Sequence, residues 1–218
     1  MPGALYIDPI LACSRIFCYI CIIHSNIDMM TEDIRQACRI LRQGGVILYP
    51  TDTVWGLGCD ATCSDAVQRI FRIKQRADGK ALITLLDSAD RLFRYVDDVP
   101  DIALELIEVT DRPLTIIYER GLTPPLAPEL LAPDGSIGIR ITDEAFSRQL
   151  CRAFGRPIVS TSANISGQPT PAIFREIAPE IINAVDYTVG FRRDDIAPHS
   201  ASSIIKLDNN GTIKIIRQ

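Results

Sequence analysis

Short apolar runs that alternate with segments of helical period restrict the fold of this chain more than any other feature. Each run is too short for a stable helix and has the length of a buried strand. They cover residues 46–49, 81–86, 114–118, 136–141 and 157–160. Strands that alternate with helices in this way predict an α/β domain, in which helices flank a sheet.

Helical segments lie between these runs. The first is expected to begin at Thr31, a good N-cap residue followed by acidic side chains, and to end at Gly44-Gly45. A second helix is expected to begin at Ser64 or Asp65, because apolar side chains then recur on one face. Further helices are predicted over residues 88–94, 100–109 and 143–154.

The C-terminal segment has the pattern of a β-hairpin. Residues 201–207 and 212–216 contain the β-favouring residue isoleucine and flank the turn Asn209-Asn-Gly211. A hairpin joins antiparallel strands, whereas helical crossovers connect parallel ones. The sheet is therefore predicted to be mixed.

The first 28 residues differ from the rest of the chain. Their apolar stretch, Ile16–Ile23, is eight residues long, whereas a helix that spans a bilayer needs about 20. A secretory signal would need a basic leading region and a small-residue cleavage site, and neither is found. Met29 and Met30 directly precede the first helix. We therefore expect no membrane segment, an N-terminal extension over residues 1–28, for which a start-site artefact is one explanation, and a single domain over residues 29–218.

Composition narrows the class of protein. The net charge is −4 at pH 7 and the pI is about 5.2, which argues against a domain whose main task is to grip a nucleic-acid backbone. The seven cysteines are an odd number, and only two histidines accompany them. Neither a disulfide framework nor a four-ligand zinc site is therefore expected, and no residue is assigned as a metal ligand. Reduced thiols favour a cytoplasmic protein.

Hydroxyl groups follow the first predicted strand, within residues 50–58. Thr51 and Thr53 come directly after the strand, where open α/β sheets bind ligands. Gly56 and Gly58 would allow the backbone to approach a ligand closely. A tight turn that contains two threonines by chance explains the segment equally well.

A basic segment connects the second helix to the next strand. Lys74, Arg76 and Lys80 place three cations within seven residues. Such a cluster can neutralise a polyphosphate, with arginine as a planar fork and lysine as a point charge. The alternative is a solvated helix end, where cations favour the helix dipole.

Two further polar features belong to strands. Ser162 and Asn164 lie in a hydroxyl-rich stretch, residues 160–167, which either presents groups to a ligand or forms an ordinary turn. Arg140 lies in an otherwise apolar strand, where a buried charge needs an anion. That anion is either a ligand or an internal carboxylate.

The order and spacing of these segments resemble the YrdC-like (YrdC/YciO) family, whose members are threonylcarbamoyl-AMP synthases. The resemblance extends from Thr31 to Arg217 and includes Gly44-Gly45 and the paired signature of Lys74-x-Arg76 with Ser162-x-Asn164. Supporting segments are Pro50-Thr-Asp-Thr-Val-Trp-Gly-Leu-Gly58, Arg112-Pro-Leu-Thr115 and Gly138-Ile-Arg140.

The resemblance implies a twisted, open mixed sheet around a concave, positively lined cavity that binds ATP and L-threonine with Mg²⁺. Lys74 and Arg76 are its implied catalytic residues. The implied threonine-binding residues are Thr51, Thr53, Arg140 and Ser202, and the implied ATP-binding residues are Lys74, Arg76, Lys80, Ser162, Asn164 and Arg217.

The implied reaction joins L-threonine, bicarbonate and ATP into L-threonylcarbamoyladenylate and pyrophosphate, for modification of an adenosine of tRNA. A separate tRNA-modifying transferase complex is the implied partner, and contact with tRNA or double-stranded RNA stays open. Trp55 stands where the family often has tyrosine, and Ala77 and Ala81 stand where it often has proline. These differences leave an alternative open, a YciO-like paralogue that acts as an RNA-binding module without this activity.

Overall fold

The fold is built around one large mixed sheet. The computed structural model describes residues 27–75, 82–197 and 201–218. Its strands are β1 Ile47–Tyr49, β2 Gly56–Gly58, β3 Ile83–Leu86, β4 Leu114–Tyr118, β5 Ile137–Ile141, β6 Ile158–Ser162, β7 Tyr187–Thr188, β8 Ser203–Leu207 and β9 Ile213–Arg217. They pair in the order β7-β1-β2-β6-β3-β5-β4-β8-β9. The predicted open mixed sheet is confirmed.

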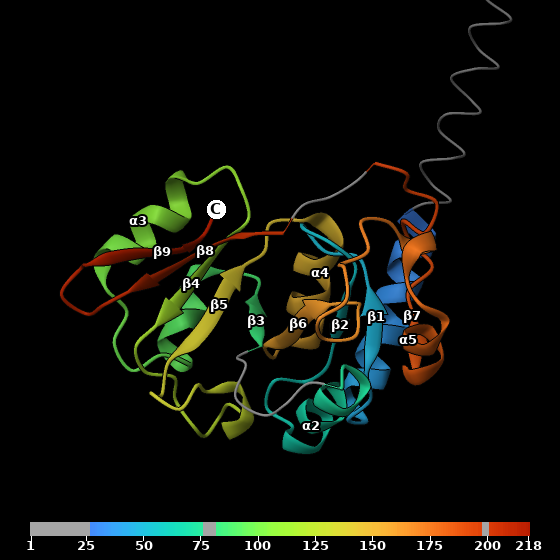
Figure 1. Cartoon of the computed structure of the whole chain (residues 1–218), viewed down its shortest axis with the longest axis horizontal. Coiled ribbons are helices and arrows are strands. Elements are labelled where there is room, and N and C mark those ends of the chain that lie inside the picture. Colours follow the sequence, from blue (N-terminus) through green and yellow to red (C-terminus); the bar gives the residue numbers. More distant parts are fainter. Residues whose placement is uncertain (1–26, 76–81, 198–200) are drawn as a thin grey trace, which may run out of the picture.

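Helices flank this sheet. The described part of the N-terminal helix covers residues 27–42, and the other helices are α2 Ser64–Ile73, α3 Asp101–Val109, α4 Ala145–Phe154 and α5 Pro179–Ala184. Short 3₁₀ helices cover η1 Ala89–Arg94, η2 Pro128–Leu130 and η3 Phe174–Glu176. In Figure 1, the sheet crosses the molecule from β7, with the N-terminal helix and α5, to the β8–β9 hairpin at the other end. No helix in the described ranges is long and apolar enough to cross a membrane.

Both strand directions meet in the middle of the sheet. The neighbours β3 and β5 run parallel, whereas β6 and β4, which pair with their outer edges, run antiparallel to them. Side chains that are far apart in the sequence, such as Ser160 and Arg140, are thereby carried on β6 and β5 to either side of β3. This arrangement positions the candidate site.

The first helix begins earlier than predicted. Residues 27–30 are already helical, and the Thr31 hydroxyl donates a hydrogen bond of 2.8 Å to the Ile27 carbonyl one turn back. Thr31 is therefore not an N-cap, and the prediction was wrong because a threonine inside a helix can satisfy its hydroxyl in this way. Most of the proposed extension, residues 1–26, lies outside the described residues.

The strand β2 was not predicted, and its glycines have a structural reason. A Cβ atom on Gly58 would lie 2.6 Å from the Tyr49 ring and 3.0 Å from the Val159 carbonyl. Glycine is therefore required there by close strand packing. We expected Gly58 to let the backbone approach a ligand closely. Instead, it allows close packing against Tyr49 and Val159 of the neighbouring strands.

Thr84, on β3, provides a test of the buried core. Its side chain is fully buried, and its hydroxyl has no hydrogen-bond partner within the part of the chain that the structure describes. Valine has nearly the same shape, so we expect Thr84→Val to raise the free energy of unfolding by about 1 kcal/mol in urea titrations. Thr142→Val is the matched control, because that buried hydroxyl lies 2.7 Å from the Ser147 hydroxyl. In the control, the free energy of unfolding should fall by about 1 kcal/mol. Equal effects of the two changes on this free energy would contradict this account.

Candidate functional site

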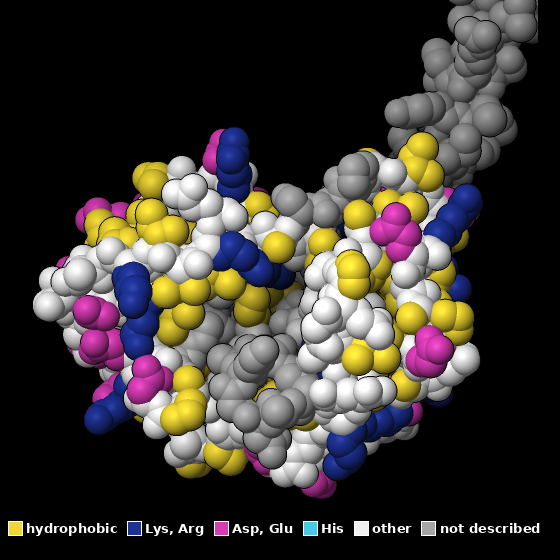
Figure 2. Space-filling view, in the orientation of Figure 1, with side chains coloured by type: hydrophobic (Ala, Val, Ile, Leu, Met, Phe, Trp, Pro, Cys, Tyr) yellow, Lys and Arg dark blue, Asp and Glu magenta, His cyan; other side chains and the backbone are white. Residues whose placement is uncertain are grey.

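Several of the predicted residues line one cavity of about 240 Å³ near the centre of the sheet. Its predicted members are Thr53, Arg140, Ser162, Ser202 and Arg217. We call it the hydroxyl-lined cavity. Figure 2 shows that this face of the molecule is hollowed near its middle, with Lys or Arg side chains on the rim. Segments separated by more than half of the chain thus meet at one place.

Arg140 is the buried cation of this cavity. Its side chain is only 3% exposed, and its Nη2 lies 2.9 Å from Oδ1 of Asp52. The contact is an ion pair and not a well-aligned hydrogen bond, since neither that oxygen nor the Arg140 Nε has a hydrogen-bond partner among the described residues. Of the two alternatives for Arg140, the structure shows the internal carboxylate, Asp52. Binding of a ligand anion stays a prediction, and the position of Arg140 in the cavity wall is compatible with it.

Arg217 is a second cation at the same cavity. Its Nε donates to the Ser202 carbonyl at 2.9 Å, and its Nη2 lies 3.3 Å from the Ser202 hydroxyl. That hydroxyl also pairs with the Thr115 hydroxyl at 2.9 Å. Burial and the nearby charge of Arg140 lower the pKa of Arg217. Two arginines held this close favour a ligand that carries negative charge.

Lys74 contacts the segment of Ser162 and Asn164, but it does not line the hydroxyl-lined cavity. It is the C-cap residue of α2, and its side chain is buried. Its Nζ donates to the Ser162 carbonyl and, at 2.7 Å, to the Asn164 carbonyl, while the Ser166 amide donates to the Lys74 carbonyl at 2.9 Å. Lys74 therefore fixes the turn after β6 to the end of α2. Arg76 and Lys80 lie outside the described residues.

Asn164 keeps an acceptor available in this turn. Its Nδ2 donates to the carbonyls of Ile165 at 3.1 Å and Gln168 at 2.7 Å. Its Oδ1 is buried and lacks a hydrogen-bond partner within the described residues. An unpaired buried acceptor is costly unless a ligand completes it.

Thr51 and Thr53 are two residues apart, and only Thr53 lines the hydroxyl-lined cavity. The Thr51 hydroxyl donates to the Val54 carbonyl at 2.7 Å and accepts from the Thr53 amide at 3.1 Å. Thr51 therefore stabilises the turn that presents Thr53, which lines the hydroxyl-lined cavity. Thr51 itself borders a second, larger cavity.

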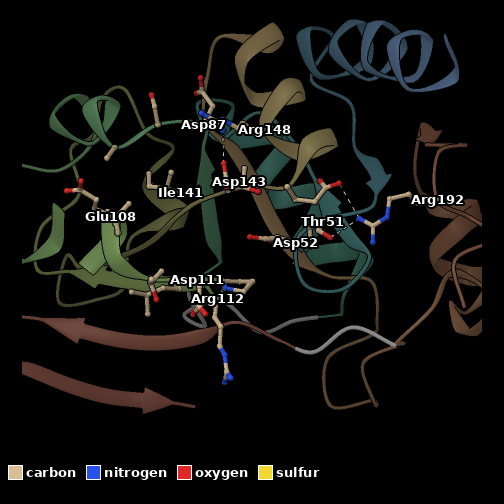
Figure 3. A pocket seen from close by; sticks show the side chains of 18 residues that line it. Thr51, Asp52, Asp87, Glu108, Asp111, Arg112, Ile141, Asp143, Arg148 and Arg192 are labelled. Carbon is tan, nitrogen blue, oxygen red and sulfur yellow. Dashed lines mark hydrogen bonds and ion pairs between the residues drawn. The ribbon is translucent and has the colours of Figure 1, made fainter. Parts of the chain in front are cut away.

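The second cavity, of about 680 Å³, is rich in carboxylates (Figure 3). We call it the acidic cavity. Its acidic residues are Asp52, Asp87, Glu108, Asp111, Asp143 and Glu144, and its basic residues are Arg112, Arg148 and Arg192. An excess of carboxylates disfavours a polyphosphate. The smaller, hydroxyl-lined cavity is therefore the better anion site, despite its size.

Arg192 was not anticipated from the sequence, although it anchors the loop of Thr51. Figure 3 shows its side chain directed at that loop. Its Nη1 lies 3.3 Å from the Thr51 carbonyl and 3.2 Å from Oε1 of Glu144, and its Nε donates to Asp195 at 2.7 Å. Nothing in the local sequence signals this contact, because the two partners are 141 residues apart.

Comparisons with known proteins show what the whole chain is similar to. The family model Sua5/YciO/YrdC, described as telomere recombination, matches residues 39–218. The threonylcarbamoyl-AMP synthase of Pseudoalteromonas translucida is 35% identical over 183 residues, which are 83% of this chain and 95% of that protein. The crystal structure of E. coli YciO aligns with a TM-score of 0.73 at 29% identity and covers 85% of this chain and 88% of that one. P. abyssi Sua5 complexed with L-threonine aligns with a TM-score of 0.71 at 26% identity, over 80% of this chain and 50% of that one.

Proposed function

The chain belongs to the Sua5/YciO/YrdC family, and on that premise we propose that it is a threonylcarbamoyl-AMP synthase. This nucleotidyltransferase forms L-threonylcarbamoyladenylate and pyrophosphate from L-threonine, bicarbonate and ATP. The observation that carries the proposal is the meeting of Arg140, Arg217 and the hydroxyl groups of distant segments in one cavity.

The chemistry needs alignment and charge compensation. The threonine amine and bicarbonate condense to a carbamate with loss of water. A carbamate oxygen then attacks the α-phosphorus of ATP, and pyrophosphate leaves with the electrons of the broken P–O bond. Two anions must approach each other, so catalysis depends on positioned cations and donors and not on a protein nucleophile.

The residues of the cavity divide between the two substrates. We propose that Arg140 binds the carboxylate of the substrate threonine, and that the hydroxyls of Thr53 and Ser202 bind the rest of the threonine molecule. We assign the nucleotide to Ser162 and Arg217 of the cavity and to Asn164 in the adjoining turn, whose buried Oδ1 lacks a hydrogen-bond partner among the described residues. Thr51 and Lys74 support these groups from behind, through the turns that they stabilise.

Two further cations of the basic segment, Arg76 and Lys80, are proposed to contact ATP. Arg76 and Lys80 would neutralise the triphosphate, with Arg76 as a catalytic cation beside Lys74. No carboxylate lines the described walls of the hydroxyl-lined cavity. Mg²⁺ prefers carboxylate and phosphate oxygens, so these walls do not by themselves make a Mg²⁺ site, and we place the ion on the phosphates of ATP.

The product and the setting follow from the same premise. The adenylate is a reactive mixed anhydride, so we propose that it passes to a separate tRNA-modifying transferase complex in the cytoplasm. Contact with tRNA or double-stranded RNA would accompany that transfer. The net charge of −4 makes RNA binding a minor part of the proposal.

The decisive experiment measures pyrophosphate release by the purified protein. We expect release from ATP only when L-threonine and bicarbonate are both present, with L-serine and glycine as poorer substrates. Release at the same rate without threonine would contradict the synthase assignment. No release, together with a salt-sensitive RNA gel shift that needs no ATP, would favour the RNA-binding alternative.

A further inference from the structure

Asp52 occupies the wall between the two cavities. It lines the acidic cavity, whereas Arg140, its ion-pair partner, lines the hydroxyl-lined cavity. The side chain of Asp52 is 11% exposed and that of Arg140 is 3% exposed. The carboxylate therefore lies behind the cation as seen from the proposed substrate.

The backbone around Asp52 is held on both sides. The preceding residue, Thr51, is tied to Val54 through its hydroxyl and to Arg192 through its carbonyl. Arg192 is in turn held by Glu144 and Asp195. A loop with this many fixed points places the Asp52 carboxylate at a defined position.

We propose that Asp52 is a positioning residue, which fixes the Arg140 guanidinium in the orientation that receives the carboxylate of threonine. This inference rests on the proposed function. An arginine side chain has several rotatable bonds, and a buried one without a fixed partner is both unstable and poorly oriented. Asp52 holds one end of the guanidinium at Nη2, and the Nε keeps its hydrogen-bonding capacity.

Charge balance supports the same role. Arg140 and Arg217 place two cations at one small cavity, and Asp52 is the carboxylate paired with Arg140. Burial raises the pKa of Asp52, while the charge of Arg140 opposes that rise. Asp52 therefore offsets one of the two positive charges at this cavity.

The test compares Asp52→Asn with Asp60→Asn. Asp60 is a matched control, because it is also a buried carboxylate, 3% exposed and 2.8 Å from Arg156, but it does not line either cavity. Equilibrium dialysis with radiolabelled L-threonine and, separately, with ATP measures each dissociation constant. We expect Asp52→Asn to raise the threonine dissociation constant about tenfold, the scale of losing one charged contact, and to leave that for ATP within about twofold. Asp60→Asn should alter neither.

Two further variants separate positioning from stability. Asp52→Glu keeps the charge and should restore most of the threonine affinity. In an Arg140→Met background, adding Asp52→Asn should have no further effect on threonine binding, because Asp52 is proposed to act only through Arg140. A threonine affinity of Asp52→Asn equal to that of the wild type, or an undiminished effect in the Arg140→Met background, would overturn the inference.

Unstable variants can still be compared. The rise in Tm on adding saturating L-threonine reports binding even in a destabilised protein. We expect this rise in the wild type and in Asp60→Asn but much less in Asp52→Asn, and equal rises would refute the role of Asp52. The synthase function is tested separately, by pyrophosphate release from the wild type. If the wild type bound threonine but released no pyrophosphate, the synthase function would be rejected, and the effect of Asp52→Asn on threonine binding could still be measured.

Discussion

Arg140→Ala is expected to lower kcat/KM for threonine by about 10²–10³-fold, the scale of losing a preorganised charge contact. The change removes the cation assigned to the threonine carboxylate. It also leaves Asp52 without its ion-pair partner in a largely buried position. Both losses act on the same subsite, so the effect should exceed that of any hydroxyl in the cavity. Pyrophosphate release across a range of threonine concentrations measures it.

Arg156→Ala is the matched control for this prediction. Arg156 also pairs with a buried aspartate, Asp60, but its own side chain is 57% exposed and lies outside the cavity. We expect a modest loss of stability and nearly unchanged kinetics. If the two alanine variants lost activity to the same degree, the effect of Arg140 would have to be attributed to stability and not to substrate binding.

The strands of the fold were predictable where a hydrophobic run had clear ends. The run 114–118 is the observed β4, Leu114–Tyr118, because Pro113 precedes it and charged residues follow it. Strands β2 and β7 were missed because they are too short to show a period. Strand β2 has three residues, two of them glycine, and β7 has two partly buried residues. Such short strands exist only because neighbouring strands provide their hydrogen bonds.

The polar residues of the site were predictable as single residues, but several of their partners were not. The sequence required an anion near Arg140, yet Asp52 looked like any acidic residue in a turn. The two are 88 positions apart, and only the arrangement of the sheet brings them together. Arg192 was missed for the same reason, and Thr115, although it belongs to a segment of the resemblance, was given no role, because each acts on the site through a contact with no local pattern.

Lys74 shows the opposite case, in which the residue was found but its surroundings were not. The sequence offered two interpretations of Lys74: a charge that neutralises phosphate, or a cation in solvent at the end of a helix, where it favours the helix dipole. The structure buries it at 2% exposure, with its ammonium against two backbone carbonyls. Its position at the C-cap of α2 directs the side chain under the turn after β6.

Lys74→Ala is accordingly expected to lower pyrophosphate release by about 10²-fold or more. The change removes a buried charge and leaves the carbonyls of Ser162 and Asn164 without this donor. The turn that carries the proposed nucleotide contacts should then lose its fixed geometry, so kcat should fall even at saturating ATP. Thermal unfolding should show a loss of about 1–3 kcal/mol, the usual cost of unpaired buried carbonyls.

Two controls distinguish local geometry from charge and from overall stability. Lys206→Ala removes a lysine that pairs with Asp134 at the surface, 2.8 Å away, and should leave both activity and stability close to the wild type. Lys74→Met keeps the length of the side chain but not its donors, and it should be nearly as inactive as Lys74→Ala. Near-normal pyrophosphate release by Lys74→Met would mean that the stem of Lys74, and not its ammonium, supports the turn. In that case the nucleotide site would depend on packing and not on the two carbonyl contacts.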